Sequence, residues 1–258
     1  MNHRRYSHFI MYTYVVHRTT FSEGFFMSAL PTGHISINRH IERVSPDLVT
    51  AAGKFQAAIL ADVAGRRGTI NGRVRALSPT MKVAGSAITV EVRPGDNLAI
   101  HAALAIAQPG DVIVVDGKGD QSCALIGEIM ASQAKASGLA GFVIDAAVRD
   151  SHELATWDFP VFSVGTNPCG PTKSVAGRLN FPISVGGAAV NPGDLIVGDA
   201  DGVVVIPRGD VARVVDLAAK KLASETARLA GIAKGELRPT WIEKELRAAG
   251  MLAEGEAL

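Results

Sequence analysis

Three charged residues, Glu128, Arg149 and Asp150, have the types and the spacing of a small ligand-binding site. Twenty residues separate Glu128 from the adjacent pair Arg149-Asp150. The carboxylate of Asp150 would give a hard oxygen ligand to Mg²⁺ or Mn²⁺, because such ions keep several waters and need only one or two protein carboxylates. Arg149 could form a forked pair with a carboxylate or an enolate oxygen, and Glu128 could orient a metal-bound water. These residues predict a site for a divalent metal and a small keto acid.

The segments around these charges predict that the charges meet at one rim of a sheet. We expect a strand at Val112–Asp116, a helix at Ala124–Ser137 and a second strand at Gly141–Asp145. Strands joined through a helix are parallel, and the right-handed crossover places the loops of such a unit along one rim. Glu128 at the helix start is therefore expected to approach Arg149-Asp150, which follows the second strand.

The predicted start of this helix is a second binding element. Gly127 would let a ligand approach the backbone closely, and the first N–H groups of a helix lack intrahelical acceptors. With the partial positive charge of the helix end, they form a binding site for a carboxylate. The expected donors are the N–H groups of Gly127, Glu128, Ile129 and Met130. The alternative is that Arg149 and Asp150 form a local surface ion pair and that Glu128 only favours a helix N-terminus.

The remaining segments predict an α/β chain in which Pro-Gly-Asp turns recur at 94–96, 109–111 and 192–194. A long helix at Pro46–Val63 should end at the glycine-rich turn 65–68, and a short helix should carry His101. The other expected elements are strands at Val83–Val92, Val161–Val164 and Ile183–Val185, a hairpin of Leu195–Val197 and Val203–Ile206, and helices at Asp210–Gly231 and Trp241–Ala249.

Composition limits the classes of partner. The 258 residues carry a formal net charge of +1 without a basic block, which argues against nucleic acid and anionic lipid as partners. No stretch approaches the roughly twenty apolar residues that span a bilayer. Cys123 and Cys169 are the only cysteines, so a disulfide scaffold is not expected and a reduced, cytoplasmic setting is the simplest interpretation.

We expect one main domain with an appendage at each end. Residues 1–26 are rich in His, Arg, Tyr and Phe and read as a disordered extension before a natural start at Met27, with a mitochondrial-type presequence as the alternative. Residues 27–235 would form the domain. Residues 236–258 would form a helical tail that contacts a neighbouring subunit.

Residues Gly119–Asp150 carry the motifs GDxxxALIGE, AxxxGxAGFVID and AAVRD. This region closely resembles the class II pyruvate aldolases that cleave 4-hydroxy-4-methyl-2-oxoglutarate and 4-carboxy-4-hydroxy-2-oxoadipate, a family related to the regulator of ribonuclease activity A (RraA) proteins. The resemblance extends from about Ile41 to Gly235. It implies an RraA-like β/β/α sandwich, with mixed sheets flanked by helices, that assembles into trimers or hexamers.

The resemblance also implies roles for residues. The family's substrate loop falls on Gly127, Glu128, Ile129 and Met130, its substrate arginine on Arg149, and its metal-binding aspartate on Asp150. The family uses an acid from the C-terminal helix of an adjacent subunit to hold metal-bound water, and Glu225 is the candidate here. The implied cofactor is Mg²⁺ or Mn²⁺, with Asp150 as the direct ligand and Glu128 and Glu225 acting through water.

The implied activity is cleavage of a 4-hydroxy-2-oxo acid to pyruvate and a second keto acid. Oxaloacetate decarboxylation should accompany it, because the same enolate forms. One alternative is a non-catalytic regulator of ribonuclease activity that binds protein, since a fold alone does not define a function. Asp150 favours the enzyme, because a non-catalytic relative could carry an amide there. Another alternative is a lyase or isomerase for a different hydroxy-keto acid.

Other polar residues are weaker candidates. His101 lies among apolar helix residues and is expected to be structural. The Gly117-Lys118-Gly119 stretch lacks the P-loop pattern and is expected to be a loop. Cys123 is expected to pack rather than attack. Schiff-base chemistry at a lysine stays open as an alternative to the metal, and the candidates are Lys82, Lys118 and Lys173.

Overall fold

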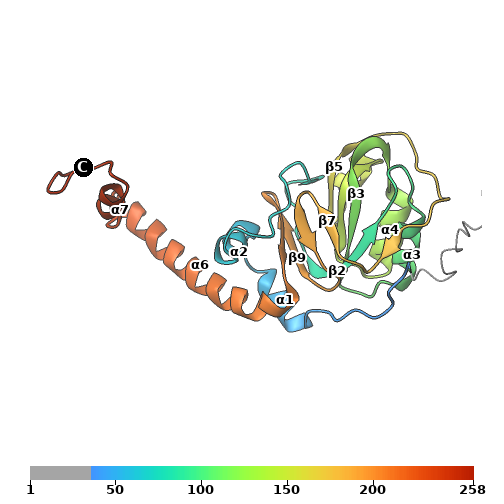
Figure 1. The fold of residues 1–258 in the computed structure, drawn as a ribbon, viewed down its shortest axis with the longest axis horizontal. Helices are drawn as coiled ribbons and strands as arrows, with labels where there is room; N and C mark the ends of the chain where they lie inside the picture. Colours follow the sequence, from blue (N-terminus) through green and yellow to red (C-terminus); the bar gives the residue numbers. More distant parts are fainter. Residues whose placement is uncertain (1–35) are drawn as a thin grey trace, which may run out of the picture. The chain divides into compact units, whose positions relative to one another are not determined.

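A mixed β-sheet organises the part of the chain that the computed structural model describes, residues 36–258 (Figure 1). The predicted extension 1–26 lies outside these residues. The strands are β1 Arg75–Ala76, β2 Val83–Glu91, β3 Asp111–Ala124, β4 Gly141–Val148, β5 Val161–Thr166, β6 Arg178–Leu179, β7 Ile183–Val185, β8 Ala188–Val190, β9 Leu195–Asp199 and β10 Gly202–Ile206. The helices are α1 Pro46–Ala52, α2 Ala57–Val63, α3 Leu98–Ile106, α4 Glu128–Ala136, α5 Ser151–Ala155, the 3₁₀ helix η1 Arg208–Asp210, α6 Val211–Ala233 and α7 Ile242–Ala248.

The order of strands in the large sheet is β1-β5-β4-β3-β2-β9-β10, with β6 paired to β2. Strands β2 to β5 are parallel neighbours, whereas β1, β6, β9 and β10 pair antiparallel. The centre of β3, Val112–Val115, is buried on both faces, as expected of a parallel strand covered on two sides. The predicted β–α–β unit is confirmed, because β3 and β4 pair in parallel on either side of α4.

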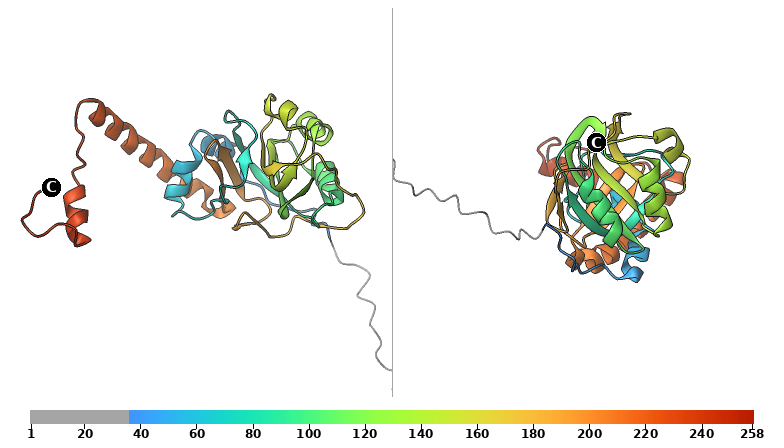
Figure 2. Two further views of the ribbon diagram at one scale, coloured as in Figure 1. Left: turned by 90° about the horizontal axis from the view of Figure 1, so that it is seen from above. Right: turned by 90° about the vertical axis from the view of Figure 1, so that its right-hand side faces the viewer.

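Two different layers cover the two faces of the sheet (Figures 1 and 2). Ile113 and Ile144 pack in a cluster with α3 and α4, whereas Val114 and Val143 pack with the two-stranded sheet of β7 and β8. This alternation follows from the two-residue repeat of side chains along a strand. The arrangement is the predicted β/β/α sandwich with mixed sheets and flanking helices.

A third apolar cluster joins α1, α2 and α6 to β9 and β10. Val211, Val214 and Ala218 bury one face of the first half of α6 there. Leu222 and Leu229, farther along the same helix, are exposed. Helix α6 therefore lies on the opposite side of the structure from α4, as Figure 1 shows.

The helix predicted at Pro46–Val63 is wrong as a single element, because the chain turns between α1 and α2. Gly53 ends α1, and a Cβ atom at this position would lie 3.1 Å from Cβ of Ala84 in β2. Helix α2 starts again at Ala57, whose N–H donates to Asp199 Oδ2 at 2.9 Å. The predicted stop after α2 is confirmed, because Gly65 and Arg66 both have positive φ.

The predicted helix start at Ala124 is also wrong, because β3 continues to Ala124 and α4 begins at Glu128. The extended path is fixed by the N–H of Leu125, which donates to Ala147 O of β4 at 2.9 Å. The Gly117-Lys118-Gly119 stretch, predicted as a loop, lies inside β3 as an irregularity. Lys118 and Gly119 have positive φ there, and the pairing with β4 shifts register between Val115 and Asp120.

The remaining helices and strands agree closely with the elements predicted from the sequence. Helix α3 carries His101, β9 and β10 form the predicted hairpin, and α6 and α7 match the two C-terminal predictions within about two residues. Within residues 36–258, every helix is too short or too polar to cross a membrane.

Candidate functional site

Glu128 and Asp150 meet at the rim of the sheet, as predicted. The backbone N–H of Glu128 donates to Asp150 Oδ2 at 2.9 Å. The guanidinium of Arg149 lies beside the same oxygen, with 3.7 Å between Nε and Oδ2. The N–H of Arg149 donates to Ile126 O at 3.0 Å, which ties the end of β4 to the turn before α4. The side chains of Arg149 and Asp150 and the backbone of Glu128 therefore form one structural unit.

Asp150 has an unusual backbone that sets its position. Its φ and ψ are 54° and 34°, in the left-handed region, and its carbonyl accepts from Leu154 as α5 begins. Aspartate tolerates this region better than most residues, yet a non-glycine residue there carries some strain. Such strain recurs at functional sites. This chain keeps it at the residue predicted to bind metal.

Position 127 suits glycine because neighbouring atoms leave no space for a side chain. The backbone angles of this residue do not require glycine. Its φ of −151° is extended and open to any residue. A Cβ atom, however, would lie 2.3 Å from Asp150 Oδ2 and 2.8 Å from Arg149 Cγ. The predicted close approach to Gly127 is thus made by the chain's own Arg149 and Asp150.

The first turn of α4 offers N–H groups as expected, and one of them is already used. The helix begins at Glu128, so the first N–H groups have no intrahelical acceptor, whereas the N–H of Ala131 reaches Gly127 O at 3.1 Å. Asp150 satisfies the N–H of Glu128. The side chains of Glu128 and Ile129 are exposed. A substrate carboxylate would thus meet this turn beside the carboxylate of Asp150.

Arg149 lies between two cavities. One, of about 140 Å³, is lined by the turn before α4 and by residues of α3 and the segment after β5: Asn97, His101, Leu125, Ile126, Gly127, Ile129, Met130, Arg149, Pro171 and Lys173. The other, of about 340 Å³, is lined by Arg149, Asp150, Ser151, Thr166, Asn167 and Pro168. The substrate loop and the aspartate therefore face different cavities that share Arg149.

The residues present fit a hard divalent cation that keeps most of its waters. Asp150 is partly exposed, with 38% of its side chain accessible. A carboxylate has about four lone-pair positions, so the single hydrogen bond from Glu128 leaves room for a metal bond. Residues 36–258 contain no cluster of three His, Cys, Asp or Glu side chains that could enclose a metal. This donor set suits Mg²⁺ or Mn²⁺ and argues against a closed structural zinc site.

Helix α6 packs on β9 and β10, whereas α4 packs on β3 and β4 at the other end of the structure (Figure 1). Glu225 of α6 is therefore remote from the start of α4, where Asp150 binds. Its Oε1 pairs with Lys221 Nζ at 3.1 Å, and Lys221 also pairs with Asp62 of α2 at 3.0 Å. These contacts, first the one with Asp62 and then the one with Glu225, raise the pKa of Lys221. Glu225 can act at the site only from another subunit.

His101, which the sequence predicts to be structural, lies in the wall of the smaller cavity. It lines the smaller cavity with Arg149 and Lys173, and its buried Nε2 has no hydrogen-bond partner among the described residues. Burial, followed by the charge of Lys173, lowers the pKa of His101. His101 therefore holds a buried ring nitrogen that no described residue satisfies. The sequence signal was weak, because only the fold brings residue 173 beside α3.

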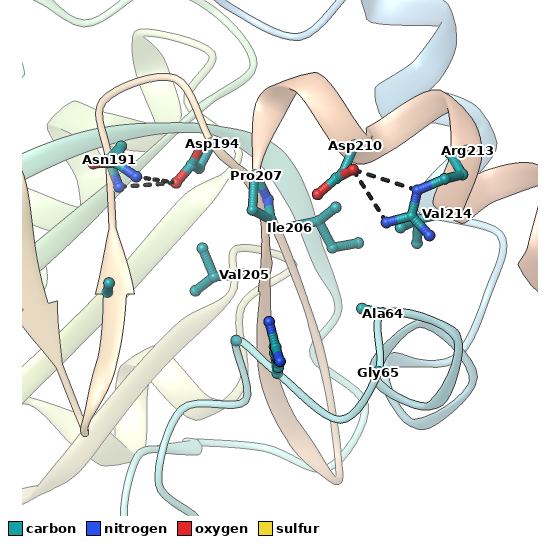
Figure 3. Close-up of a pocket in the computed structure, with 13 residues that line it drawn as sticks. Ala64, Gly65, Asn191, Asp194, Val205, Ile206, Pro207, Asp210, Arg213 and Val214 are labelled. Carbon is teal, nitrogen blue, oxygen red and sulfur yellow. Dashed lines mark hydrogen bonds and ion pairs between the residues drawn. The ribbon is translucent and has the colours of Figure 1, made fainter.

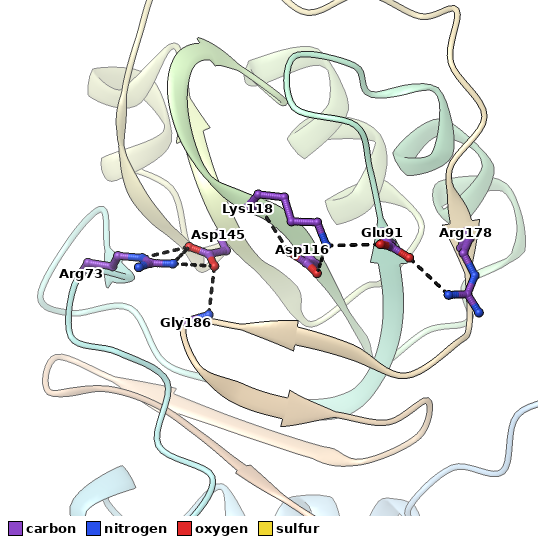
Figure 4. Close-up of polar contacts among 7 residues, drawn as sticks. All are labelled: Arg73, Glu91, Asp116, Lys118, Asp145, Arg178 and Gly186. Atoms are coloured by element: carbon purple, nitrogen blue, oxygen red, sulfur yellow. Dashed lines mark hydrogen bonds and ion pairs between the residues drawn. The ribbon is translucent and has the colours of Figure 1, made fainter.

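One of the three candidate Schiff-base lysines, Lys118, loses support from the structure. Lys118 binds Asp116 at 2.6 Å and Glu91 at 3.2 Å (Figure 4). The hydrogen bond to Asp116 is the main cause that raises the pKa of Lys118, whereas a Schiff-base lysine needs a lowered pKa. Burial raises the pKa of Cys123, which agrees with the prediction that this thiol packs.

A buried carboxylate in β4, paired with a half-exposed arginine, was not predicted from the sequence. Asp145, five residues before Asp150, accepts from Arg73 at 2.9 Å and from the N–H of Gly186 at 2.9 Å (Figure 4). It thereby ties the turn between β7 and β8 to β4. A carboxylate within the apolar run of β4 was the available signal, because buried charges are normally paired.

A larger cavity than the two beside Arg149 lies between α2, β10 and the start of α6 (Figure 3). Its volume is about 480 Å³. Asp210 pairs with Arg213 in its wall at 3.1 Å. It contains none of the predicted site residues, so size alone does not mark the site.

Comparisons with known proteins identify the family of this chain. Residues 45–205 match the sequence model of the RraA-like family, described as Aldolase/RraA. The chain is 42% identical over 182 residues to a protein of Halalkalibacterium halodurans named "Putative 4-hydroxy-4-methyl-2-oxoglutarate aldolase", covering 70% of this chain and 87% of the relative. It is 33% identical over 142 residues to "Putative 4-hydroxy-4-methyl-2-oxoglutarate aldolase 3" of Arabidopsis thaliana, covering 52% and 85%.

A solved structure is similar as well. RraAS2 of Streptomyces coelicolor, described as an unusual member of the RNase ES inhibitor RraA protein family, superposes with a TM-score of 0.66 at 30% identity. The match covers 73% of this chain and 99% of that protein. The fold, the match over residues 45–205 and the relatives agree. This chain belongs to the RraA-like family.

Proposed function

We propose that this chain is a divalent-metal-dependent aldolase. It would cleave 4-hydroxy-4-methyl-2-oxoglutarate, or a related 4-hydroxy-2-oxo acid, to pyruvate and a second keto acid, and it would also decarboxylate oxaloacetate. One observation gives the most support to this proposal: Arg149, Asp150 and the first turn of α4 contact one another beside two cavities. The relatives named as putative aldolases point to the same chemistry.

The keto-acid end of the substrate would bind where positive charge is concentrated. The N–H groups of Gly127, Ile129 and Met130 lie at the positive end of α4 and suit a carboxylate. The guanidinium of Arg149, 43% exposed and next to both cavities, suits the neighbouring keto oxygen. Asp150 would hold Mg²⁺ or Mn²⁺, with Glu128 and Glu225 acting through water. When bound, the cation would supply Lewis-acid polarisation of the keto group.

Cleavage needs a base, an electron acceptor and a proton donor. Glu128, exposed beside Asp150, would orient the water that removes the proton from the distal hydroxyl. The bond between carbons 3 and 4 then breaks, and its electron pair moves to carbon 3 and the keto oxygen as an enolate. Arg149 stabilises this oxygen as its charge develops, which is where a fixed charge contributes most. A proton returned to carbon 3 gives pyruvate.

The far end of the substrate would lie toward His101 and Lys173. Both line the small cavity with Arg149, and Lys173 carries a positive charge there. A second carboxylate or a hydroxyl on the substrate would give the free Nε2 of His101 a partner. This side of the site therefore favours a dicarboxylate over a monocarboxylate.

The active form would be a trimer or a hexamer in the cytoplasm. Helix α6, which carries Glu225, packs at the other end of the structure from the start of α4, where Asp150 binds, so a site that uses both acids requires a neighbouring subunit. In the chain alone, Lys221 neutralises Glu225, and it would do so until the subunits meet.

A second candidate is a regulator that binds a ribonuclease without catalysis, and the similarity to RraAS2 favours it. One experiment separates the two. Pyruvate release is followed by coupled reduction to lactate, with each aldol substrate and oxaloacetate supplied separately, with and without Mg²⁺. The aldolase predicts turnover that a chelator abolishes. The absence of turnover with every substrate would favour the regulator, and turnover unaffected by a chelator would reject the metal mechanism.

A further inference from the structure

Two extended segments that carry the only cysteines run side by side next to the site. The end of β3, residues 121–124, is joined to residues 167–169 by two hydrogen bonds. Asn167 Nδ2 donates to Gln121 O at 2.8 Å, and the N–H of Ala124 donates to Cys169 O at 2.8 Å. Asn167 Oδ1 also accepts from the N–H of Cys169 at 2.8 Å, which fixes the turn of that segment. Cys123 and Cys169 therefore occupy adjacent positions on neighbouring segments.

Gly95 lies next to the sulfur of Cys123 and also binds the segment that carries Cys169. A Cβ atom at Gly95 would lie 3.5 Å from Cys123 Sγ. Gly95 O accepts from the N–H of Thr172 at 2.8 Å, and Thr172 is three residues after Cys169. The chain from Cys169 to Thr172 is thus held at both ends beside the buried Cys123. Cys169 itself is exposed, and both thiols are free.

This spacing is compatible with a disulfide. Neighbouring segments that are hydrogen-bonded side by side lie about 4.7–4.9 Å apart, and Cys123 directly precedes Ala124, whose N–H donates to Cys169 O at 2.8 Å. Disulfides join α-carbons that are about 4.4–6.8 Å apart. Only side-chain rotation and a small shift of the exposed segment 167–172 are required. The exposed segment can make this shift, because it contains no helix and lies at the surface.

We propose that Cys123 and Cys169 form an oxidation site that closes to an intramolecular disulfide. The accessible thiolate of Cys169 attacks a peroxide oxygen, the O–O bond breaks, and water leaves after protonation. The Cys123 sulfur then loses its proton and displaces the hydroxyl of the resulting sulfenic acid as a second water. Two thiols and one hydrogen peroxide thus give one disulfide and two waters.

The bond would alter both cavities beside Arg149. Asn167 and Pro168 line one cavity, and Pro171 and Lys173 line the other, so a single segment borders both. A Cβ atom at Gly170 would lie 3.0 Å from an Arg149 guanidinium nitrogen. Drawing Cys169 toward Cys123 moves this segment against Arg149 and narrows the entrance. This functional consequence depends on the proposed aldolase, whereas the disulfide itself does not.

The test uses the full-length protein treated with hydrogen peroxide and digested with trypsin without reductant. The expected product is a single linked pair, peptide 119–135 joined to peptide 150–173, which dithiothreitol separates. The intact chain should become lighter by two hydrogens. Cys123→Ser and Cys169→Ser are the matched controls, and neither should give the linked pair. Cysteines that both stay open to alkylation, stable sulfinic or sulfonic acid at Cys169, or links only between subunits would each overturn the proposal.

A second measurement tests whether the disulfide narrows the entrance to the site beside Arg149. The oxidised wild-type protein should show a KM for the aldol substrate raised several-fold, with a smaller change in kcat, and dithiothreitol should reverse it. Peroxide should leave the Cys169→Ser protein unchanged. A linked protein with unaltered KM would overturn the narrowing of the site. Failure of the aldolase proposal is distinguishable, because the reduced protein would then also be inactive.

Discussion

The carboxylate of Asp150 binds the backbone N–H of Glu128 across the end of the β–α–β unit, with 2.9 Å between the two atoms. This contact joins the loop after β4 to the first turn of α4, and Arg149 adds its guanidinium 3.7 Å from the same oxygen. An exposed ion pair of this kind contributes little to stability. Its position therefore matters more for ligand binding than for folding.

Substitution Gly127→Ala should damage the site with little effect on folding. The added Cβ would lie 2.3 Å from Asp150 Oδ2, so Asp150 and Arg149 must move, whereas the extended backbone accepts alanine. We expect turnover to fall at least about tenfold, because a shift of about 1 Å is costly in an organised site. Thermal unfolding should change by only a few degrees. Gly209→Ala is the matched control, because no described atom lies within 4 Å of its added Cβ. Equal turnover for the two variants would contradict the site.

The small cavity predicts a role for His101 in substrate affinity. His101→Phe should raise KM about tenfold, which is the typical loss of one hydrogen bond to a charged partner. His101→Gln keeps a hydrogen-bonding group and should lose less. The two variants are compared by steady-state kinetics and by thermal unfolding. A merely structural histidine would lower the melting temperature in both variants without this difference in KM.

A shared site predicts complementation between inactive variants. Asp150→Asn and Glu225→Gln proteins should each be nearly inactive alone, and their mixture after subunit exchange should regain activity. Complete sites form there because one subunit supplies Asp150 and another supplies Glu225. A mixture of Asp150→Asn with Arg149→Lys is the control, because both residues come from the same chain. Recovery in the control mixture, or in neither mixture, would argue against Glu225 acting from a second subunit.

The lowered pKa of Asp96 predicts how the stability of the protein depends on pH. Burial alone would raise its pKa, but hydrogen bonds from Ser174, Leu98, Thr172 and Val175 outweigh burial and lower the pKa. A lowered folded-state pKa means that the contribution is complete above the unfolded value of about 4 and is lost as pH falls further.

Asp96→Asn should therefore destabilise the protein by about 2 kcal/mol at pH 7, the range for hydrogen bonds to a charged group. The difference from wild type should shrink between about pH 5 and pH 2. Urea unfolding at several pH values measures it. A difference that is the same at pH 7 and pH 3 would show that the charge of Asp96 contributes nothing.

The sequence predicted the joint of the β–α–β unit because apolar runs and connection rules determine it. It failed where a distant contact decides the local structure. The break after Gly53 depends on Ala84, and the late start of α4 depends on the bond between Leu125 and Ala147. Such contacts leave no local pattern of residues.

For the site, too, the sequence predicted what local patterns determine and not what distant contacts determine. Glu128, Arg149 and Asp150 were predicted because each lies at the end of an element. The place of His101 beside Lys173 in the cavity wall was not predicted, because the two meet only through the segment that Asp96 holds, 78 residues before Ser174. Glu225 forms an i,i+4 pair with Lys221 that the sequence makes visible, but the contact of Lys221 with Asp62 requires the packing of α2 on α6.

The most direct test of the central claim is exchange of the methyl protons of pyruvate with deuterium in heavy water, followed by proton NMR. This exchange requires the enolate and no second substrate. The account predicts exchange by wild-type protein with Mg²⁺ or Mn²⁺, loss with a chelator, and loss in Asp150→Asn, which keeps its shape and tolerates the same backbone angles. Exchange that survives both the chelator and Asp150→Asn, or no exchange in the wild type with metal, would contradict it.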